Sequence, residues 1–316
     1  QKTAYEIPKR DWSSDVCSSD LIGELPDAAA YGDEGSNTLG NTARAVRLKV
    51  PVLRSLGLDR LVSLGPSPVP PPDEARPRFA YGRMAEASPG KDSVTGHWEM
   101  MGIVLERPFP TFPNGFSPDL IAEFERRIGR GTLGNVVASG TEIIDRLGAE
   151  HVQTGKPIVY TSADSVFQVA AHEEVIPIAE QYRICEIAFD LVGRGLNVGR
   201  VIARPFVGTP GSFTRTANRH DYALDPTGET LLDRLTAAGT PIVSVGKIHD
   251  LFAGRGTGRS LHTASDAEGM DRLEEALAET PAGFLFANLV DFDTVYGHRN
   301  DVAGYAANLE IGRAHV

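Results

Sequence analysis

The chain has 316 residues, of which 42 are acidic and 31 are basic, so its formal net charge is -11. An acidic surface repels nucleic acids and anionic membranes, which excludes a polyanion as the expected partner. No run of 18 apolar residues occurs, so the sequence predicts no membrane-spanning helix. Two cysteines give no disulfide framework and indicate a cytoplasmic protein.

The two ends of the sequence do not have the patterns of folded protein. Residues 11–21 show neither helical nor strand periodicity. One codon choice for Ile311–Val316 has a reverse complement that encodes Asp-Val-Cys-Ser-Ser-Asp, which is the sequence of Asp15–Asp20. We therefore interpret residues 1–21 and 311–316 as adaptor-derived segments and leave them out of the functional reasoning.

The first half of the remaining chain predicts loops and one clear helix. Residues 22–41 are rich in Gly and Asp and predict a loop that enters a helix. The proline-dense stretch 66–77 predicts an extended surface connection. Ser117 and Pro118 are typical of a helix start, and the apolar spacing that follows predicts an amphipathic helix ending near Gly129.

The second half alternates between strand and helix patterns. Cys185 lies on the apolar side of a predicted helix, which favours a buried core thiol. The alternation predicts an α/β fold with a largely parallel sheet. Strands are predicted at 157–161, 198–206, 241–248 and 283–292, and helices at 178–192, 230–238 and 268–278.

A group of possible metal ligands, Asp291–His298, follows the last apolar strand, Phe284–Val290. Ligand sites in open α/β sheets lie beyond the carboxyl ends of strands. A mixed carboxylate and imidazole set suits Mn²⁺, Zn²⁺ or Fe²⁺ better than Ca²⁺. The alternative interpretation is an aspartate that caps a helix, next to a surface histidine.

A second segment, Ser88–Glu99, has the composition of a nucleophile loop. Glycines bracket small hydroxyl residues, and Lys91 and His97 are close by. A serine hydroxyl needs a base or a metal to react. The spacing matches neither the nucleophile elbow of hydrolases nor a P-loop. The alternative is a polar loop that caps the following helix.

A third group is cationic and consists of Arg200, Arg204, Arg215 and Arg219, with Lys247 as a further candidate. Because the planar guanidinium fork matches phosphate oxygens, this group in an acidic protein favours a phosphorylated substrate. The alternative is a set of solvent-exposed salt bridges.

Together these segments resemble the phosphopentomutases, members of the alkaline phosphatase superfamily, nearly continuously from Ile22 to Leu309. The resemblance implies an alkaline-phosphatase-like α/β core with a largely parallel sheet and helices on both faces, formed by residues 22–105 and 223–310. It also implies an inserted α/β cap, residues 106–222. The motifs that carry it are Ile22–Ala28, Gly90–Ser93, Thr95–Glu99, Tyr160–Ser165, Arg204–Gly208, Asn218–Tyr222 and Asn288–Asp293.

The resemblance also implies a reaction and its residues. Family members are isomerases of nucleotide salvage that interconvert α-D-ribose 1-phosphate and ribose 5-phosphate, and the 2-deoxyribose pair, with two Mn²⁺ ions. The reaction passes through a phosphoenzyme and a bisphosphate intermediate. Ser93 occupies the place of the family's phosphorylated threonine, which is also a metal ligand. Asp293 and His298 match further metal ligands, Arg200, Arg215 and Lys247 match phosphate ligands, and Ser162 and Asp164 match positions near the sugar.

The sequence departs from the family at its metal ligands. Adaptor-type sequence stands where the family has an aspartate before Ile22, and no Asp-His-Gly motif occurs. We therefore expect the chain as written to be an inactive fragment. Two alternatives stay open: a cofactor-independent phosphoglycerate mutase, which shares the superfamily core, and a non-catalytic sugar-phosphate binding module that keeps the arginines.

Overall fold

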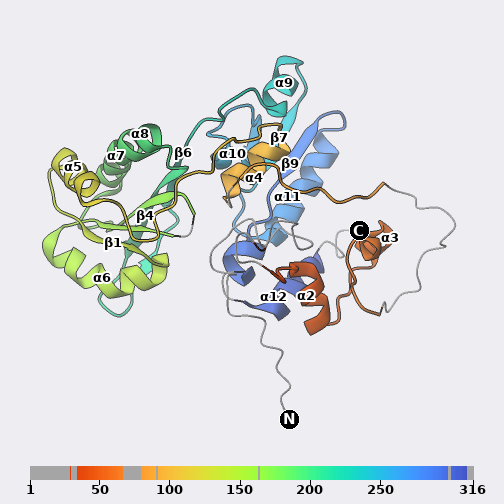
Figure 1. The fold of residues 1–316 in the computed structure, drawn as a ribbon, viewed down its shortest axis with the longest axis horizontal. Helices are drawn as coiled ribbons and strands as arrows, with labels where there is room; N and C mark the ends of the chain where they lie inside the picture. Colours follow the sequence, from red (N-terminus) through yellow and green to blue (C-terminus); the bar gives the residue numbers. More distant parts are fainter. Residues whose placement is uncertain are drawn as a thin grey trace, which may run out of the picture. The chain divides into compact units, whose positions relative to one another are not determined.

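A computed structural model of the chain describes residue 29 and residues 34–66, 80–89, 92–162, 164–297 and 300–311. The chain divides into two compact units. Unit 1 comprises Gln1–Leu105, Glu229–His249 and Gly256–Val316, and unit 2 comprises Glu106–Gly228 and Asp250–Arg255 (Figure 1). Both adaptor-type segments lie outside the described residues, apart from Ile311. Most of the proline-dense stretch 66–77 also lies outside them.

Unit 2 is built on a mixed sheet in the strand order β1-β2-β3-β4-β5, in which β6 also pairs with β4. The pairs β1–β2 and β3–β4 are parallel, whereas β2–β3, β4–β5 and β4–β6 are antiparallel. The strands are β1 (Leu133–Val137), β2 (Ile158–Thr161), β3 (Val166–His172), β4 (Arg200–Val207), β5 (Thr214–Arg215) and β6 (His220–Ala223).

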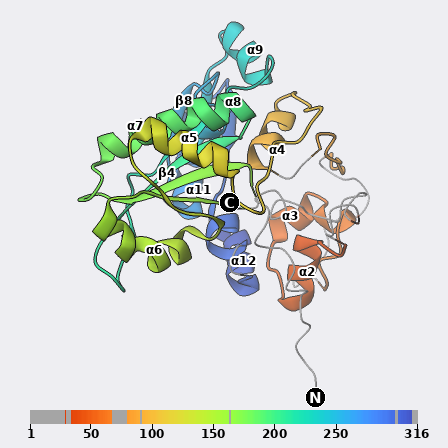
Figure 2. The ribbon, with the colours of Figure 1, turned by 60° about the vertical axis from the view of Figure 1, so that its left-hand side comes forward.

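Helices cover both faces of this sheet (Figure 2). The α5 and α7 side packs against an apolar cluster that includes Phe167, Val201 and the buried thiol of Cys185, as the sequence predicts. Helix α6 covers the other face with Ile143 and Ile144. The helices are α5 (Pro118–Ile128), α6 (Gly140–Thr154), α7 (Ile178–Ala188), which a π-helical turn (Phe189–Gly193) continues, and α8 (Arg194–Leu196).

Local signals explain where the predicted helix α5 begins and ends. The Ser117 hydroxyl accepts a hydrogen bond from the amide of Leu120, and Pro118 occupies the first turn. Gly129 then adopts a left-handed conformation with φ 73°, which a residue without a side chain reaches at least cost. The predicted boundaries of this helix are confirmed.

Unit 1 contains a parallel three-stranded sheet in the order β8-β7-β9. Helix α11 packs on it through Ala276 and Leu273. This parallel sheet with its helices confirms the predicted α/β class. Its strands are β7 (Ile242–Val245), β8 (Arg259–Leu261) and β9 (Phe284–Ala287), and its helices are α2 (Thr38–Ala45), α3 (Pro51–Ser55), α4 (Ser93–Met100), α9 (Leu231–Ala237), α11 (Asp266–Glu279) and α12 (Val302–Leu309). A 3₁₀ turn (Leu58–Arg60) follows α3, and α10 (Ile248–Leu251) begins in unit 1.

Strand β9 is shorter than the sequence predicts. The apolar run extends to Val290, but the strand ends at Ala287. Its partner β7 ends at Val245, whose carbonyl still accepts a hydrogen bond from the amide of Asn288, and Gly246 then adopts a left-handed conformation with φ 78°. A π-helical turn, Phe292–Tyr296, follows instead. Among the described helices, none combines the length and the hydrophobicity that crossing a bilayer requires.

Candidate active site

Ser93 is the first residue of α4, and its side chain is buried. The preceding Asp92 caps the helix, because its Oδ1 accepts a hydrogen bond from the amide of Val94 at 2.8 Å. The capping interpretation of this segment is therefore correct for Asp92. The partial positive charge of the helix N-terminus favours negative charge at Ser93, as a nucleophilic oxygen requires. Gly90 and Lys91 lie outside the described residues.

His97 links the start of α4 to the end of β9. Its Nδ1 lies 2.7 Å from the backbone carbonyl oxygen of Ser93, and its Nε2 lies 3.1 Å from the side-chain amide nitrogen, Nδ2, of Asn288. Since a carbonyl can only accept and an amide nitrogen can only donate, these contacts assign the ring proton to Nδ1. The imidazole is thus neutral and joins two segments that are 191 residues apart. The sequence placed His97 near the loop but gave no sign of Asn288 as its partner.

The acidic residues that follow β9 are partly structural. The amide of Asp266 donates to Asp291 at 2.8 Å, and the amide of Asp291 donates to Asp266 at 2.9 Å. Asn308 also donates to Asp266, and burial raises the pKa of Asp266. The Asp291 carboxylate therefore caps the first residue of α11, which agrees with the alternative interpretation of this segment as an aspartate that caps a helix.

The two expected metal ligands of this segment are not described: the side chain of Asp293 and the whole of His298 lie outside the described residues. Among the side chains that the structure does describe, no three His, Cys, Asp or Glu residues gather as a metal site would require. Lys247 lies half-buried in the turn after β7.

In unit 2 the structure brings together three of the expected substrate residues. The buried Arg200 begins β4 and contacts Asp164 at 3.4 Å. Asp164 comes from the loop between β2 and β3, where its amide donates to the hydroxyl of Ser162 at 3.3 Å. A second carboxylate, Asp221 of β6, lies 3.7 Å from Arg200. Two aspartates thus share the charge of this guanidinium.

Asp221 also organises the neighbouring arginines. Its two oxygens accept two hydrogen bonds from Arg219, both at 2.6 Å. Burial opposes ionisation, but Arg219 and then Arg200 outweigh it, so the pKa of Asp221 lies well below its usual range. Burial and the nearby Arg219 lower the pKa of Arg204 to about 10, and Arg204 donates to Gln168 at 3.1 Å.

Arg215 differs from these arginines. It lies on β5 opposite Phe206, six residues along β4 from Arg200, a separation of about 20 Å at the usual strand rise. Its side chain is exposed, and among the described residues it makes no hydrogen bond or ion pair. The backbone therefore places Arg200 and Arg215 at opposite ends of β4, and only Arg215 keeps an uncompensated charge.

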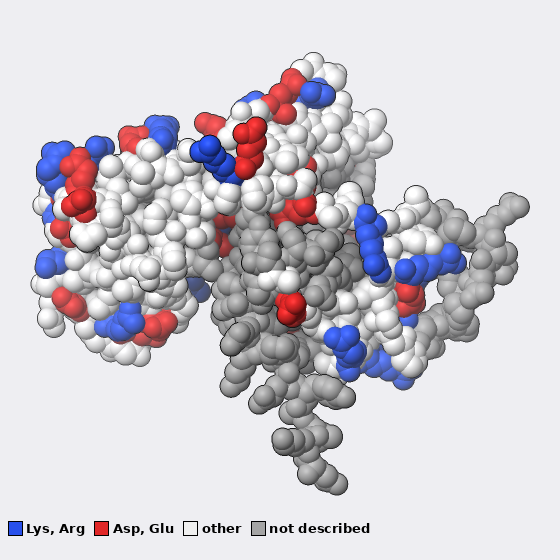
Figure 3. Space-filling model, viewed as in Figure 1, with Lys and Arg blue, Asp and Glu red and all other residues white. Residues whose placement is uncertain are grey.

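Several arginines on the surface helices of unit 2 pair with a glutamate of their own helix. Arg126 and Arg127 both contact Glu123 on α5, and Arg183 contacts Glu180 on α7. Figure 3 shows acidic and basic side chains interspersed on the face that it draws. The salt-bridge alternative given for the cationic group fits Arg200 and Arg219, which pair with Asp164 and Asp221, although these pairs are largely buried; it does not fit Arg215.

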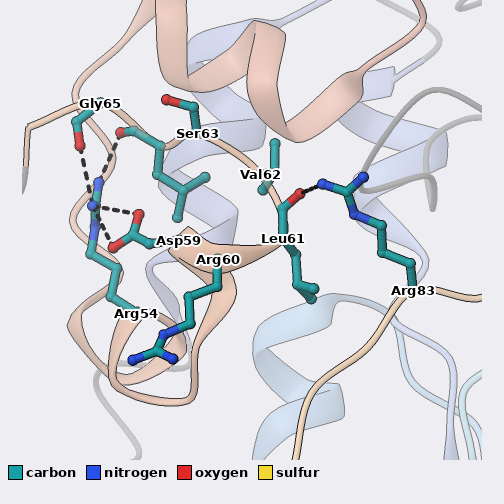
Figure 4. A pocket seen from close by; sticks show the side chains of 9 residues that line it. Arg54, Asp59, Arg60, Leu61, Val62, Ser63, Gly65 and Arg83 are labelled. Carbon is teal, nitrogen blue, oxygen red and sulfur yellow. Dashed lines mark hydrogen bonds and ion pairs between the residues drawn. The ribbon is translucent and has the colours of Figure 1, made fainter. Parts of the chain in front are cut away.

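One pocket of unit 1 is also lined by arginines (Figure 4). Arg54 donates to both oxygens of Asp59, at 2.8 and 2.9 Å, and to the carbonyls of Leu64 and Gly65. Arg83 donates to the carbonyl of Leu61. Because these guanidinium groups already bond to carbonyl and carboxylate oxygens, the pocket serves to hold the loop after α3 rather than to bind an anion.

The sequence resembles known proteins over most of its length. Residues 31–312 match the family model of the metalloenzyme superfamily. A phosphopentomutase of Caldanaerobacter subterraneus subsp. tengcongensis is 55% identical over 295 residues, which cover 93% of this chain and 74% of the relative. A phosphopentomutase of Carboxydothermus hydrogenoformans is 56% identical over 296 residues, which cover 93% of this chain and 75% of the relative. These similarities confirm the resemblance that the motifs indicate.

Proposed function

Because the chain belongs to the phosphopentomutase family, we propose that the protein with its full set of metal ligands interconverts α-D-ribose 1-phosphate and ribose 5-phosphate, and the corresponding 2-deoxyribose pair. It is accordingly an isomerase that moves a phosphoryl group within one molecule. The chain as written, without the family's aspartate before Ile22 and its Asp-His-Gly motif, is expected to be inactive. A phosphoglycerate mutase and a non-catalytic binding module are both less consistent with the identity to phosphopentomutases along 93% of the chain. The acidic composition and a phosphorylated small molecule as substrate fit the cytoplasmic location expected from the sequence.

The position of Ser93 carries this proposal. In the proposed cycle, phosphorylated Ser93 gives its phosphoryl group to the free sugar hydroxyl: a bond forms between that oxygen and phosphorus, and the bond from phosphorus to Ser93 breaks. The proton of the sugar hydroxyl is passed, directly or through solvent, to the Ser93 oxygen that is released, so Ser93 regains its hydroxyl. The resulting bisphosphate then returns its other phosphoryl group to Ser93, and the sugar oxygen thereby released takes up a proton. The α4 N-terminus stabilises negative charge on the Ser93 oxygen in both steps.

His97 keeps this oxygen in place. By accepting from Asn288 and donating to the Ser93 carbonyl, the imidazole fixes the first turn of α4 against the end of β9. A divalent metal bound beside Ser93 would lower the pKa of the hydroxyl and neutralise the transferred phosphoryl group. Superfamily membership implies such a metal, and we propose two Mn²⁺ ions with Asp293, His298 and Ser93 among their ligands.

The remaining residues hold the substrate in this proposal. Arg215 binds the phosphate that is not reacting, and Lys247 is a further candidate for this role. The resemblance also implies this role for Arg200, but Arg200 lies at the other end of β4 beside Asp164, so we propose that it contacts the substrate there together with Ser162 and Asp164. Arg215 contributes more than Arg200, because Asp164 and Asp221 already offset the charge of Arg200.

The experiment is phosphoryl labelling. A version of the protein in which the family's missing metal ligands are restored is incubated with Mn²⁺ and ribose 1,5-bisphosphate carrying labelled phosphate, and the modified residue is identified by peptide mapping. Ser93 should carry the label, and added ribose 5-phosphate should remove it. Ser93→Ala should abolish labelling, whereas the control Ser93→Thr keeps a hydroxyl and should retain it. Label on another residue, or equal labelling of Ser93→Ala, contradicts the assignment.

A further inference from the structure

The hydroxyl of Tyr160 is an unusual feature of unit 2. Tyr160 lies on β2, on the face that α6 covers, and its side chain is completely buried. Among the described residues its Oη has no hydrogen-bond partner. A buried hydroxyl without a partner is unfavourable, and native structures rarely keep one without a reason. Burial raises the pKa of Tyr160, so at neutral pH the hydroxyl is a donor.

This hydroxyl lies at the N-terminus of α6. A Cβ built on Gly140, the first residue of the helix, would lie 2.8 Å from Tyr160 Oη and 3.5 Å from Arg215 Nη1. Because Gly140 has no side chain, the hydroxyl and the guanidinium both lie close to its backbone at the start of the helix. The hydroxyl of Ser139 accepts from the amide of Glu142, while the amides of Gly140 and Thr141 have no recorded acceptor among the described residues.

Three donors with no acceptor thus converge: the first amides of a 15-residue helix, a buried tyrosine hydroxyl and an exposed arginine. Helix N-termini favour anions, and the arginine fork matches two phosphate oxygens. Glu142 is the nearby acidic residue on the first turn, and an ion pair with Arg146 at 3.3 Å shares its charge.

We propose that Tyr160 and the N-terminus of α6 complete a phosphate pocket around Arg215, and that this pocket holds the non-reacting phosphate of the pentose phosphate. That the ligand is a pentose phosphate rests on the proposed function, whereas the binding of a phosphate dianion rests on the arrangement of the donors. In this pocket Tyr160 is a specificity residue: its hydroxyl donates to a phosphate oxygen and rejects ligands that offer no acceptor there. Glycine is required at position 140 because the Cβ of any other residue would lie 2.8 Å from the hydroxyl and push it out of place.

The test measures binding and folding separately in the full chain. Isothermal titration gives the affinities for ribose 5-phosphate and inorganic phosphate, and thermal unfolding without ligand gives the stability. Tyr160→Phe should weaken the binding of both anions about tenfold or more, since it removes a hydrogen bond to a charged group. It should not lower the unfolding midpoint, because the lost hydroxyl has no partner in the free protein. If the hydroxyl had only a structural role, Tyr160→Phe would lower the unfolding midpoint and leave the affinities for both anions unchanged.

Two variants complete the design. Gly140→Ala should also weaken binding of both anions, because the added Cβ occupies the space beside Tyr160. Tyr222→Phe is the control: Tyr222 packs on the opposite face of the same sheet, and its hydroxyl donates to the carbonyl of Tyr182 at 3.3 Å. It should leave both affinities unchanged.

The outcomes separate the pocket from the proposed function. Unchanged phosphate affinity in Tyr160→Phe and Gly140→Ala, or a parent protein that binds neither anion, overturns the pocket. A parent protein that binds inorganic phosphate as tightly as ribose 5-phosphate, with both variants impaired, supports the pocket and contradicts the proposed substrate.

Discussion

Replacing Asp221 by asparagine removes the carboxylate that holds the buried arginines of unit 2. Asp221 accepts two hydrogen bonds from Arg219 at 2.6 Å and lies 3.7 Å from Arg200, with its side chain only 6% exposed. Asparagine has the same shape, but its NH₂ group would face a guanidinium donor. Arg219 would then lose both of its hydrogen bonds to the carboxylate, and Arg200 would keep its contact with Asp164.

Breaking a buried pair by removing one partner costs about 3–5 kcal/mol. We expect Asp221→Asn to lower the free energy of unfolding by this amount, measured by urea denaturation at pH 7. The pKa of Asp221 is lowered in the folded protein, so its contribution is complete above the unfolded value of about 3.9 and is lost only as the pH falls through the folded value. The loss in the variant should therefore be equal at pH 7 and pH 5.

Glu123→Gln serves as the matched control. Glu123 also contacts two arginines, Arg126 and Arg127, but on the exposed surface of α5. Its removal should leave the urea midpoint nearly unchanged, because solvent screens exposed pairs. If Asp221→Asn destabilises the protein no more than Glu123→Gln does, the arginine cluster does not depend on Asp221 and the reasoning is refuted.

Two further predictions concern binding and pH. Arg215→Ala should cost about 1.5–3 kcal/mol of ribose 5-phosphate binding, measured by titration, and Arg200→Ala should cost less; the reverse order would contradict the role of uncompensated charge. Burial lowers the pKa of His151, whose Nδ1 donates to the carbonyl of Lys156 at 2.7 Å and whose Nε2 accepts from the amide of His172 at 2.8 Å. Its neutral form is favoured in the folded state, so stability is complete above about pH 6.5 and falls as the pH drops below that value. Urea midpoints measured from pH 7.5 to pH 5 should show this fall, and His151→Gln should flatten it.

Elements with local signals could be predicted from the sequence. In each of α5, α7 and α9 the residues that mark the helix lie within or next to the helix itself: cap and stop residues in α5, apolar periodicity in α7 and a capping pair in α9. These predicted helices are confirmed. In α9 the side chain of Thr230 accepts from the amide of Asp233 while Asp233 accepts in return. The sequence patterns did not indicate α6 or β3, although β3 is buried along its whole length. Its run Val-Phe-Gln-Val-Ala-Ala-His has no alternation to mark a strand, since helices cover both faces.

The end of β9 shows why apolar runs mislead. Leu289 and Val290 continue the hydrophobic pattern, but a strand also needs a neighbouring backbone. The amide of Asn288 still donates to the carbonyl of Val245, but the amide of Asp291 donates to the side chain of Asp266 instead of to a neighbouring strand.

The sequence by itself determined the fold class, the family and the types of residue that carry the chemistry, because these depend on composition, periodicity and motifs along the chain. Only the tertiary structure decided which charges offset one another. Asp164, Arg200 and Asp221 come from three separate segments, and so do Gly140, Tyr160 and Arg215. Pairing across strands set these neighbours, and the burial that accompanies it made one arginine a partner of aspartates and left another with a free charge.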